Sequence, residues 1–319
     1  MKTDRLKNRW YSRILLLIVL LAVILVIWKN ISEISSYSFV FKYGYFIASF
    51  AVIIINYLFC FLIWHWLTVS FGLRVPVLKA ARGWFLSYLG KYVPGKIALL
   101  LVRMDAYDGY SGRKVAVATV VEYIVALVAA CLVVLISLLF SPEIVPDYIR
   151  WIAVIGTVLL LLVLYPPLLR GIVNLVFRMI KKAPLNEVPA FMTILRLVGA
   201  WMIATFVSGF AFYLILNSLS PVSLKYYIII TGVYGIAGLA GLAAFFAPSG
   251  IGVREGVIFL ILPAFVPEPT VIVGAIAIRL ITTVTEVLLA GFFYFIERIR
   301  RRRIGVPDGN RHLNQDSQG

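Results

Sequence analysis

Long apolar runs constrain the fold of this chain more than any other feature. Several of them are long enough, at about 20 helical residues, to cross about 30 Å of hydrocarbon. Of the 319 residues, 62% are hydrophobic and only 14% are charged, whereas soluble domains contain about 25% charged residues. Within a bilayer the backbone polar groups must be satisfied internally, which helices achieve. The sequence therefore predicts an all-α polytopic membrane protein.

Six apolar runs are interpreted as full membrane spans. They cover approximately residues 14–28, 44–71, 115–140, 151–169, 197–219 and 271–295. The first run follows a basic segment, as in a signal peptide, but no small-x-small cleavage site follows Trp28, so we expect an uncleaved span. We expect a membrane domain over residues 1–297 and a basic, disordered cytoplasmic tail over residues 298–319.

The charges between the runs predict how the bundle is oriented. Basic residues cluster in segments 2–13, 74–82, 103–114, 170–196 and 298–311. The opposite gaps hold only Lys29, Lys42, Arg150 and Lys225. Loops rich in Lys and Arg stay in the cytoplasm. We therefore expect a multi-pass protein of the cytoplasmic (inner) membrane with both termini in the cytoplasm.

Two further apolar segments, at about residues 83–102 and 226–266, are interrupted. The first is broken by Pro94 and Gly95, and the second by Pro248, Gly250 and Gly252. Proline and glycine interrupt helices, and the flanking charges place both ends of each segment on the same side. The prediction is two re-entrant broken-helix units of opposite orientation, a pattern that an inverted repeat would produce.

The first broken segment carries Lys91 and Lys96 on either side of its break. Irregular backbone at membrane depth is tolerated where it lines a watery cavity, and two lysines beside a helix start suit a lipid phosphate. The alternative is a cytoplasmic loop whose lysines extend to the membrane interface.

The second broken segment places Arg254 and Glu255 between two very apolar stretches. An ionisable pair at membrane depth is costly and indicates a functional site. Arg254, near a helix start, suits an anionic headgroup. The alternative is an outer loop with a surface ion pair, in which case residues 226–247 would span fully. Gly232, Gly235, Gly238 and Gly241 recur every third residue just before this break, a spacing that favours close helix packing.

Three further charges lie within predicted spans: Glu122, Arg279 and Glu286. Arg279 and Glu286 are seven residues apart, so they share one helix face. Charges at this depth should face the interior and pair with one another, with Arg103 or with Arg254. Two interpretations fit this pattern. The charges either serve function, as a headgroup cavity or as a carboxylate that takes protons to drive transport, or they form a structural ion-pair lock.

Other functions have less support in the residues. The net charge of +16 does not indicate nucleic-acid binding, because basic tracts beside spans meet anionic lipid. Cys60 and Cys131 lie in apolar runs without metal-binding spacing, so no metal or cofactor is expected. Since GxSxG, HExxH and nucleotide-binding motifs are absent from the sequence, we expect neither an enzyme nor ATP-driven transport.

Residues 88–96 together with Arg103 resemble the first signature of the flippase-like membrane domain family of lysylphosphatidylglycerol synthase, the multiple peptide resistance factor. Residues 248–256 resemble its second signature, with Ser249 where many relatives have glycine. The resemblance covers about residues 10–300 and implies lipid translocation between leaflets. Relatives fused to a synthase move aminoacylated phosphatidylglycerol outward, which confers resistance to cationic peptides. We expect a stand-alone member without the synthase domain, so a phospholipid, a glycolipid and a polyprenyl-phosphate carrier all stay open as substrates.

Three hypotheses follow. In the first, a lipid transporter uses Lys91, Lys96, Arg103 and Arg254 to hold an anionic headgroup, while Glu122, Glu255, Arg279 and Glu286 line the path. In the second, the protein is a non-transporting scaffold for a separate lipid synthase or glycosyltransferase, and in the third it is a membrane-embedded lipid enzyme. A homo-oligomer is compatible with each of them.

Overall fold

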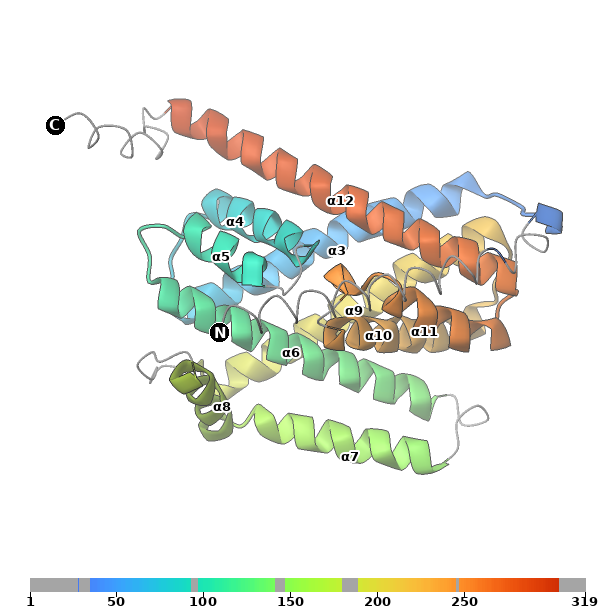
Figure 1. Cartoon of the computed structure of the whole chain (residues 1–319), viewed down its shortest axis with the longest axis horizontal. Helices are drawn as coiled ribbons and strands as arrows, with labels where there is room; N and C mark the ends of the chain where they lie inside the picture. Colours follow the sequence, from blue (N-terminus) through green and yellow to red (C-terminus); the bar gives the residue numbers. More distant parts are fainter. Residues whose placement is uncertain are drawn as a thin grey trace, which may run out of the picture.

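The computed structural model describes residue 28 and residues 35–92, 97–140, 147–179, 189–244 and 247–303. Every regular element within these ranges is a helix, which confirms the predicted all-α membrane fold (Figure 1). Apart from Trp28, the first predicted span lies outside the described residues, as do the break residues Pro94 and Gly95.

Four long helices form the frame of the bundle. They are α3 (Tyr43–Ser70), α6 (Gly112–Leu139), α9 (Phe191–Leu219) and α12 (Glu268–Arg303). The shortest of them have 28 residues, which at 1.5 Å per residue gives a length of about 42 Å. All four are long and apolar enough to cross a membrane. They confirm the spans that were predicted near these positions. The helix α12 continues through residues 298–303 of the predicted tail, and residues 304–319 lie outside the described residues.

The span predicted over residues 151–169 is wrong in its extent. The structure divides this region into α7 (Asp147–Val163) and α8 (Pro166–Met179). Pro166 and Pro167 explain the division, because proline interrupts a helix from within but is well accommodated in a first turn. The helix α7 is apolar but has only 17 residues, or about 25 Å.

The first interrupted segment folds as a hairpin. The helix α4 (Val77–Leu89) continues into a short 3-10 helix, η1 (Gly90–Tyr92), and the chain returns through α5 (Ile97–Ala106). The helices α4 and α5 pack against one another. Their 13 and 10 residues correspond to about 20 and 15 Å, so neither arm alone crosses the bilayer.

The second interrupted segment is also a hairpin. It contains α10 (Tyr227–Ala243), η3 (Pro248–Gly250), α11 (Val253–Ile261) and η4 (Leu262–Ala264), and α10 packs against α11. The backbone φ angles of Ser249, Gly250 and Gly252 are positive, at 53°, 69° and 82°. A right-handed helix requires negative φ angles, so the helix is interrupted here. Two of the three residues are glycines, which tolerate positive φ angles. With η2 (Leu224–Tyr226), the first arm reaches 20 residues and is by itself long enough to cross a membrane, whereas the returning α11 has nine.

The two hairpins enter the bundle from opposite ends and meet near its middle. Figure 1 shows α4 and α5 extending from one end and α10 and α11 from the other. Their tips, η1 and η3, are in contact. Each hairpin is followed by a long helix, α6 or α12, so the order of elements agrees with an inverted repeat, which stays a prediction.

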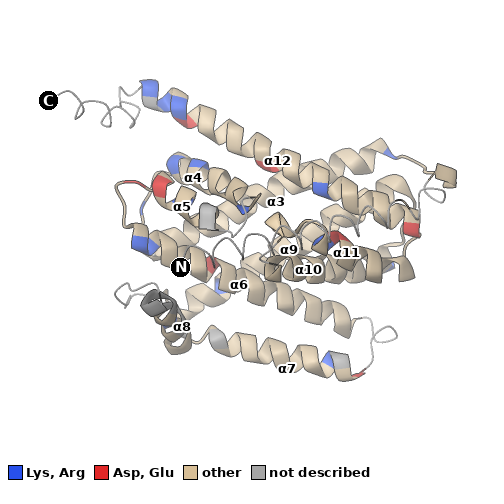
Figure 2. Ribbon diagram, in the orientation of Figure 1, with Lys and Arg blue, Asp and Glu red and all other residues tan. Residues whose placement is uncertain are grey.

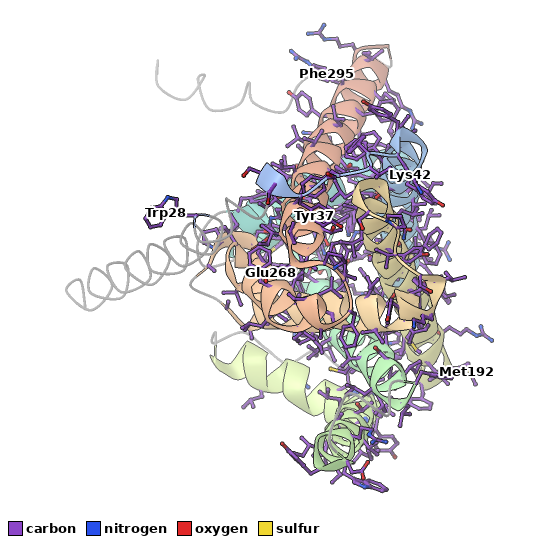
Figure 3. All side chains as sticks on the ribbon, turned by 90° about the vertical axis from the view of Figure 1, so that its right-hand side faces the viewer. Trp28, Tyr37, Lys42, Met192, Glu268 and Phe295 are labelled. Carbon is purple, nitrogen blue, oxygen red and sulfur yellow. The ribbon has the colours of Figure 1, made fainter. Side chains whose placement is uncertain are left out.

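The charged side chains separate between the two ends of the bundle. Figure 2 shows Lys and Arg gathered where α4 and α6 begin and α12 ends. The opposite end, which faces the viewer in Figure 3, carries Lys42 and Glu268 together with Asp147, Arg150 and Lys225. This agrees with the one-sided charge of the predicted loops.

Two apolar cores lie on either side of the hairpin tips. The first contains Trp64, Trp84 and Phe85, and the second contains Phe212 and Leu262. All five side chains are fully or almost fully buried. The segment of α3 that connects the two cores, residues 53–60, faces the cavity described next.

Candidate functional site

A cavity of about 330 Å³ lies where the two hairpin tips meet α3, α6, α9 and α12. Its volume is at the lower end of the range for small-molecule sites. Six of the eight residues predicted to bind substrate line it. They are Lys91, Arg103, Glu122, Arg254, Arg279 and Glu286. Residues about 195 positions apart along the chain are thereby brought together, as the broken-helix pattern predicts.

The two remaining predicted residues are placed differently. Lys96 lies outside the described residues. Glu255 is buried, and its carboxylate accepts a hydrogen bond of 2.6 Å from the backbone N–H of Gly252. It therefore caps the N-terminus of α11, where a negative charge is favourable, and it does not line the cavity.

Glu286 anchors the tip of the first hairpin to α12. Its carboxylate forms an ion pair of 2.5 Å with Lys91 and accepts a hydrogen bond of 2.8 Å from the Tyr92 hydroxyl. It also accepts a hydrogen bond from Tyr57 on α3. The Lys91 ammonium lies 4.5 Å from the centre of the Tyr88 ring. A carboxylate that is 2% exposed is thus held by three donors from two elements.

Arg279 ties the second hairpin to the same face of α12. Its guanidinium donates a hydrogen bond of 3.1 Å to the carbonyl oxygen of Ser249, and its Nε lies 4.0 Å from the Glu255 carboxylate. Arg279 and Glu286 are two helical turns apart. The helix α12 therefore contacts both hairpin tips through charged side chains.

Arg103 and Glu122 form a closed ion pair at the edge of the cavity. The pair is 2.5 Å long, with side chains 1% and 6% exposed. Arg103 also donates to the Ser87 hydroxyl at 3.1 Å and lies 4.1 Å from the centre of the Trp64 ring. The other carboxylate oxygen of Glu122 accepts a bond of 3.1 Å from the Trp84 indole. This environment fits the structural-lock alternative for the pair better than a headgroup ligand.

Arg254 differs from the other cations of the cavity. In the described part of the chain, no carboxylate lies within 4.0 Å of its guanidinium, whereas Lys91, Arg103 and Arg279 each have one. The nearest aromatic ring is that of Tyr234, with its centre 5.4 Å away. The cavity therefore presents one half-buried guanidinium whose charge is not paired at short range.

Both hairpins and all of these residues lie within one family profile. The profile of the lysylphosphatidylglycerol synthase TM region matches residues 13–290. The chain belongs to this family. No curated protein sequence matches the chain. Membership confirms the resemblance seen in the two signatures and supports a lipid-related role in a membrane.

Several cavity residues of this family member were missed in the sequence. Asn56 and Tyr57 are a polar pair in the apolar run of α3, and such a pair on a predicted span could have indicated an inward face. The Asn56 amide donates a hydrogen bond of 2.8 Å to Ser208 on α9. Tyr234 stands within the glycine stripe of α10, which was interpreted as a packing face that can also yield in a gating motion.

Gly241 allows the Arg254 side chain to cross α10, which leads to a prediction. A Cβ atom at Gly241 would lie 2.5 Å from Cγ and 2.9 Å from Cδ of Arg254. Because the overlap is with the arginine stem and not with the backbone, Gly241→Ala should force another rotamer on Arg254 and displace its guanidinium. Alanine also favours the helix by about 0.5–1 kcal/mol. For the lipid movement that is proposed below, we expect a loss in reconstituted vesicles by a variant that is still folded.

The matched control is Gly199→Ala on α9, where nothing lies within 4 Å of the added Cβ. Equal lipid movement by the two variants would show that the position of Arg254 does not matter.

Proposed function

We propose that this protein moves a lipid with an anionic headgroup between the two leaflets of the cytoplasmic membrane, without hydrolysing ATP. The observation that carries the proposal is Arg254, the cavity guanidinium that has no carboxylate within 4.0 Å in the described part of the chain. A charge in a low-dielectric site is costly unless it is paired. A lipid phosphate would supply the missing partner.

The chemistry of arginine supports a phosphate ligand. The planar guanidinium forms two parallel hydrogen bonds to phosphate oxygens, and such charge-assisted bonds contribute about 1.5–3 kcal/mol each. The other cavity cations are already engaged by Glu286, Glu122 and Glu255. Within the proposal, Arg254 is the primary headgroup ligand, and Lys91 and Arg279 are cations that exchange between partners.

The two ties on α12 suggest how access could alternate. Glu286 holds the tip of one hairpin and Arg279 holds the tip of the other. In transporters built from opposed broken helices, one unit rocks against the other around a central site. We propose that releasing the Lys91–Glu286 tie opens the cavity toward one leaflet, and that releasing the Arg279 tie opens it toward the other.

Orientation and partners belong to the same proposal. The end with α4, the start of α6 and the end of α12 carries most of the described Lys and Arg side chains. Because basic loops stay in the cytoplasm, we place this end there. A separate synthase that supplies the lipid would then reach the protein from the cytoplasm or within the membrane.

The test is lipid movement in vesicles that contain purified protein and no ATP. Fluorescent phosphatidylglycerol, aminoacylated phosphatidylglycerol and a polyprenyl phosphate are compared, and dithionite reports the fraction left in the outer leaflet. We expect faster movement of at least one anionic lipid than in protein-free vesicles. Mass spectrometry should recover that lipid chemically unchanged.

Three outcomes would contradict the proposal or favour its alternatives. If Arg254→Ala moves lipid as fast as Arg196→Ala, which replaces an exposed arginine on α9, Arg254 is not the headgroup ligand. Movement by folded wild type that is no faster than in protein-free vesicles would favour a scaffold. A new lipid species in the mass spectrum would indicate an enzyme.

A further inference from the structure

The cavity has two chemically different walls. The wall formed by the hairpin tips and α12 carries Lys91, Arg254 and Glu286. The wall formed by α6 and α10 is largely apolar. It contains Ala126, Leu127, Ala130, Gly235, Gly238, Leu239 and Leu242. A site with a charged side and an apolar side matches an amphiphile.

The helices α6 and α10 are in close contact at one end of this wall. The Ser137 hydroxyl donates a hydrogen bond of 2.9 Å to the carbonyl oxygen of Ile228. A Cβ atom on Gly232 would overlap the Ser137 side chain, and one on Gly235 would lie 3.1 Å from Val134. Glycine is thus needed here for close packing, as the stripe predicts.

One turn further along α10 there is open space beside the helix. Nothing lies within 4 Å of a Cβ atom placed on Gly238, and this residue lines the cavity with Ala130 of α6. Tyr123 of α6 also lines the cavity and is 37% exposed. These residues define an α6–α10 crevice of the cavity, with Tyr123, Ala126, Leu127 and Ala130 on one side and Gly238, Leu239 and Leu242 on the other.

We propose that this α6–α10 crevice is the path by which the hydrocarbon chains of the bound lipid leave the cavity. This inference rests on the proposed function. A volume of about 330 Å³ suits a headgroup and is too small for long chains as well. The chains must stay in an apolar environment while the headgroup lies against Arg254. The crevice provides such a route, because small side chains at Ala126, Ala130 and Gly238 leave room beside the polar wall.

Photolabelling tests the path independently of transport. Two probes are used, a phosphatidylglycerol with a diazirine in one acyl chain and farnesyl phosphate with a diazirine in its chain. After irradiation in vesicles, labelled peptides of wild type and Arg254→Ala are compared. We expect labels in residues 123–130 and 238–242 that fall about tenfold in Arg254→Ala, the loss expected for one charged hydrogen bond. The probe that shows this dependence identifies acyl or polyprenyl chains.

Filling the crevice gives a second test. Gly238→Leu should reduce both the crevice labels and lipid movement to about a tenth of the wild-type values, since a filled path must be vacated. The control is Gly199→Leu, at a position whose Cβ is equally unobstructed but does not line the cavity.

The outcomes separate this inference from the proposed function. Labels that depend on Arg254 but lie on other helices would overturn the crevice while leaving lipid binding in the cavity intact. The crevice would also be overturned if Gly238→Leu, at normal protein yield, moved lipid as fast as the wild type. If neither lipid movement nor labelling depends on Arg254, both the proposed function and the crevice are overturned.

Discussion

Replacing Arg103 by alanine is expected to destabilise the protein by about 3–5 kcal/mol, because the substitution leaves a buried charge without its partner. Glu122 would keep its hydrogen bond from Trp84 and lose the ion pair of 2.5 Å. The Trp64 ring would also lose the guanidinium that lies 4.1 Å from its centre. The two side chains are 1% and 6% exposed at the edge of the cavity, so little solvent is available to replace the lost partner.

The measurement is thermal unfolding of the purified protein in detergent. A change of this size lowers the melting temperature by on the order of 10 °C. The double variant Arg103→Met with Glu122→Leu should recover most of the loss, since apolar residues can replace a buried pair as a unit. If Arg103→Ala has the same melting temperature as the wild type, the Arg103–Glu122 pair is not the structural lock that its burial indicates.

Replacing Glu286 by glutamine is expected to stop lipid movement and to lower stability by about 3–5 kcal/mol. An amide keeps the shape of the carboxylate, but Tyr57 and Tyr92 donate to different oxygens of Glu286, and an amide has only one accepting oxygen, so one of these two hydrogen bonds must be lost or reversed. It cannot balance the charge of Lys91, which lies 2.5 Å away in the structure. The tip of the first hairpin would then be held only by neutral hydrogen bonds.

A double-variant cycle with Lys91→Met separates the two roles of Glu286. The combined variant restores charge balance, so its melting temperature should rise toward that of the wild type. Its lipid movement should stay lost, because the tie that has to open and close is gone. Restored movement in the combined variant would show that Glu286 is structural and takes no part in the transport cycle.

The general architecture could be predicted from the sequence because it follows from a few strong physical signals. Apolar runs gave the four long helices, and Pro248 with Gly250 and Gly252 gave the second break. The positions of Lys, Arg and the breaks together predicted two opposed hairpins, since charge decides on which side a loop stays. Span 151–169 was wrong because hydropathy does not register that Pro166 and Pro167 begin a new helix.

The partners of the charged residues could be predicted only in part: Arg103 was among the partners expected for Glu122, whereas Lys91 was not expected as the partner of Glu286. Burial cost explains why Arg103, Glu122 and Glu286 must be paired, but it does not say with what. Arg103 pairs with Glu122, 19 residues away, whereas Glu286 pairs with Lys91, 195 residues away. Only the packing of the hairpins decides between these neighbours. For the same reason the sequence could not show that Arg103 is enclosed and that, among the described residues, Arg254 has no carboxylate within 4.0 Å.

The most direct test of the account is the initial rate at which vesicles containing wild type, Arg254→Lys or Arg254→Ala move fluorescent phosphatidylglycerol, aminoacylated phosphatidylglycerol and polyprenyl phosphate. Lysine keeps the charge but loses the two-pronged hydrogen bonding of arginine. For the lipid that is the substrate, we predict the highest rate for wild type, an intermediate rate for lysine, and for alanine a rate lower by about 10- to 100-fold. Equal rates in the three proteins, or movement of none of the lipids by folded wild type, would contradict an anionic-lipid site at Arg254.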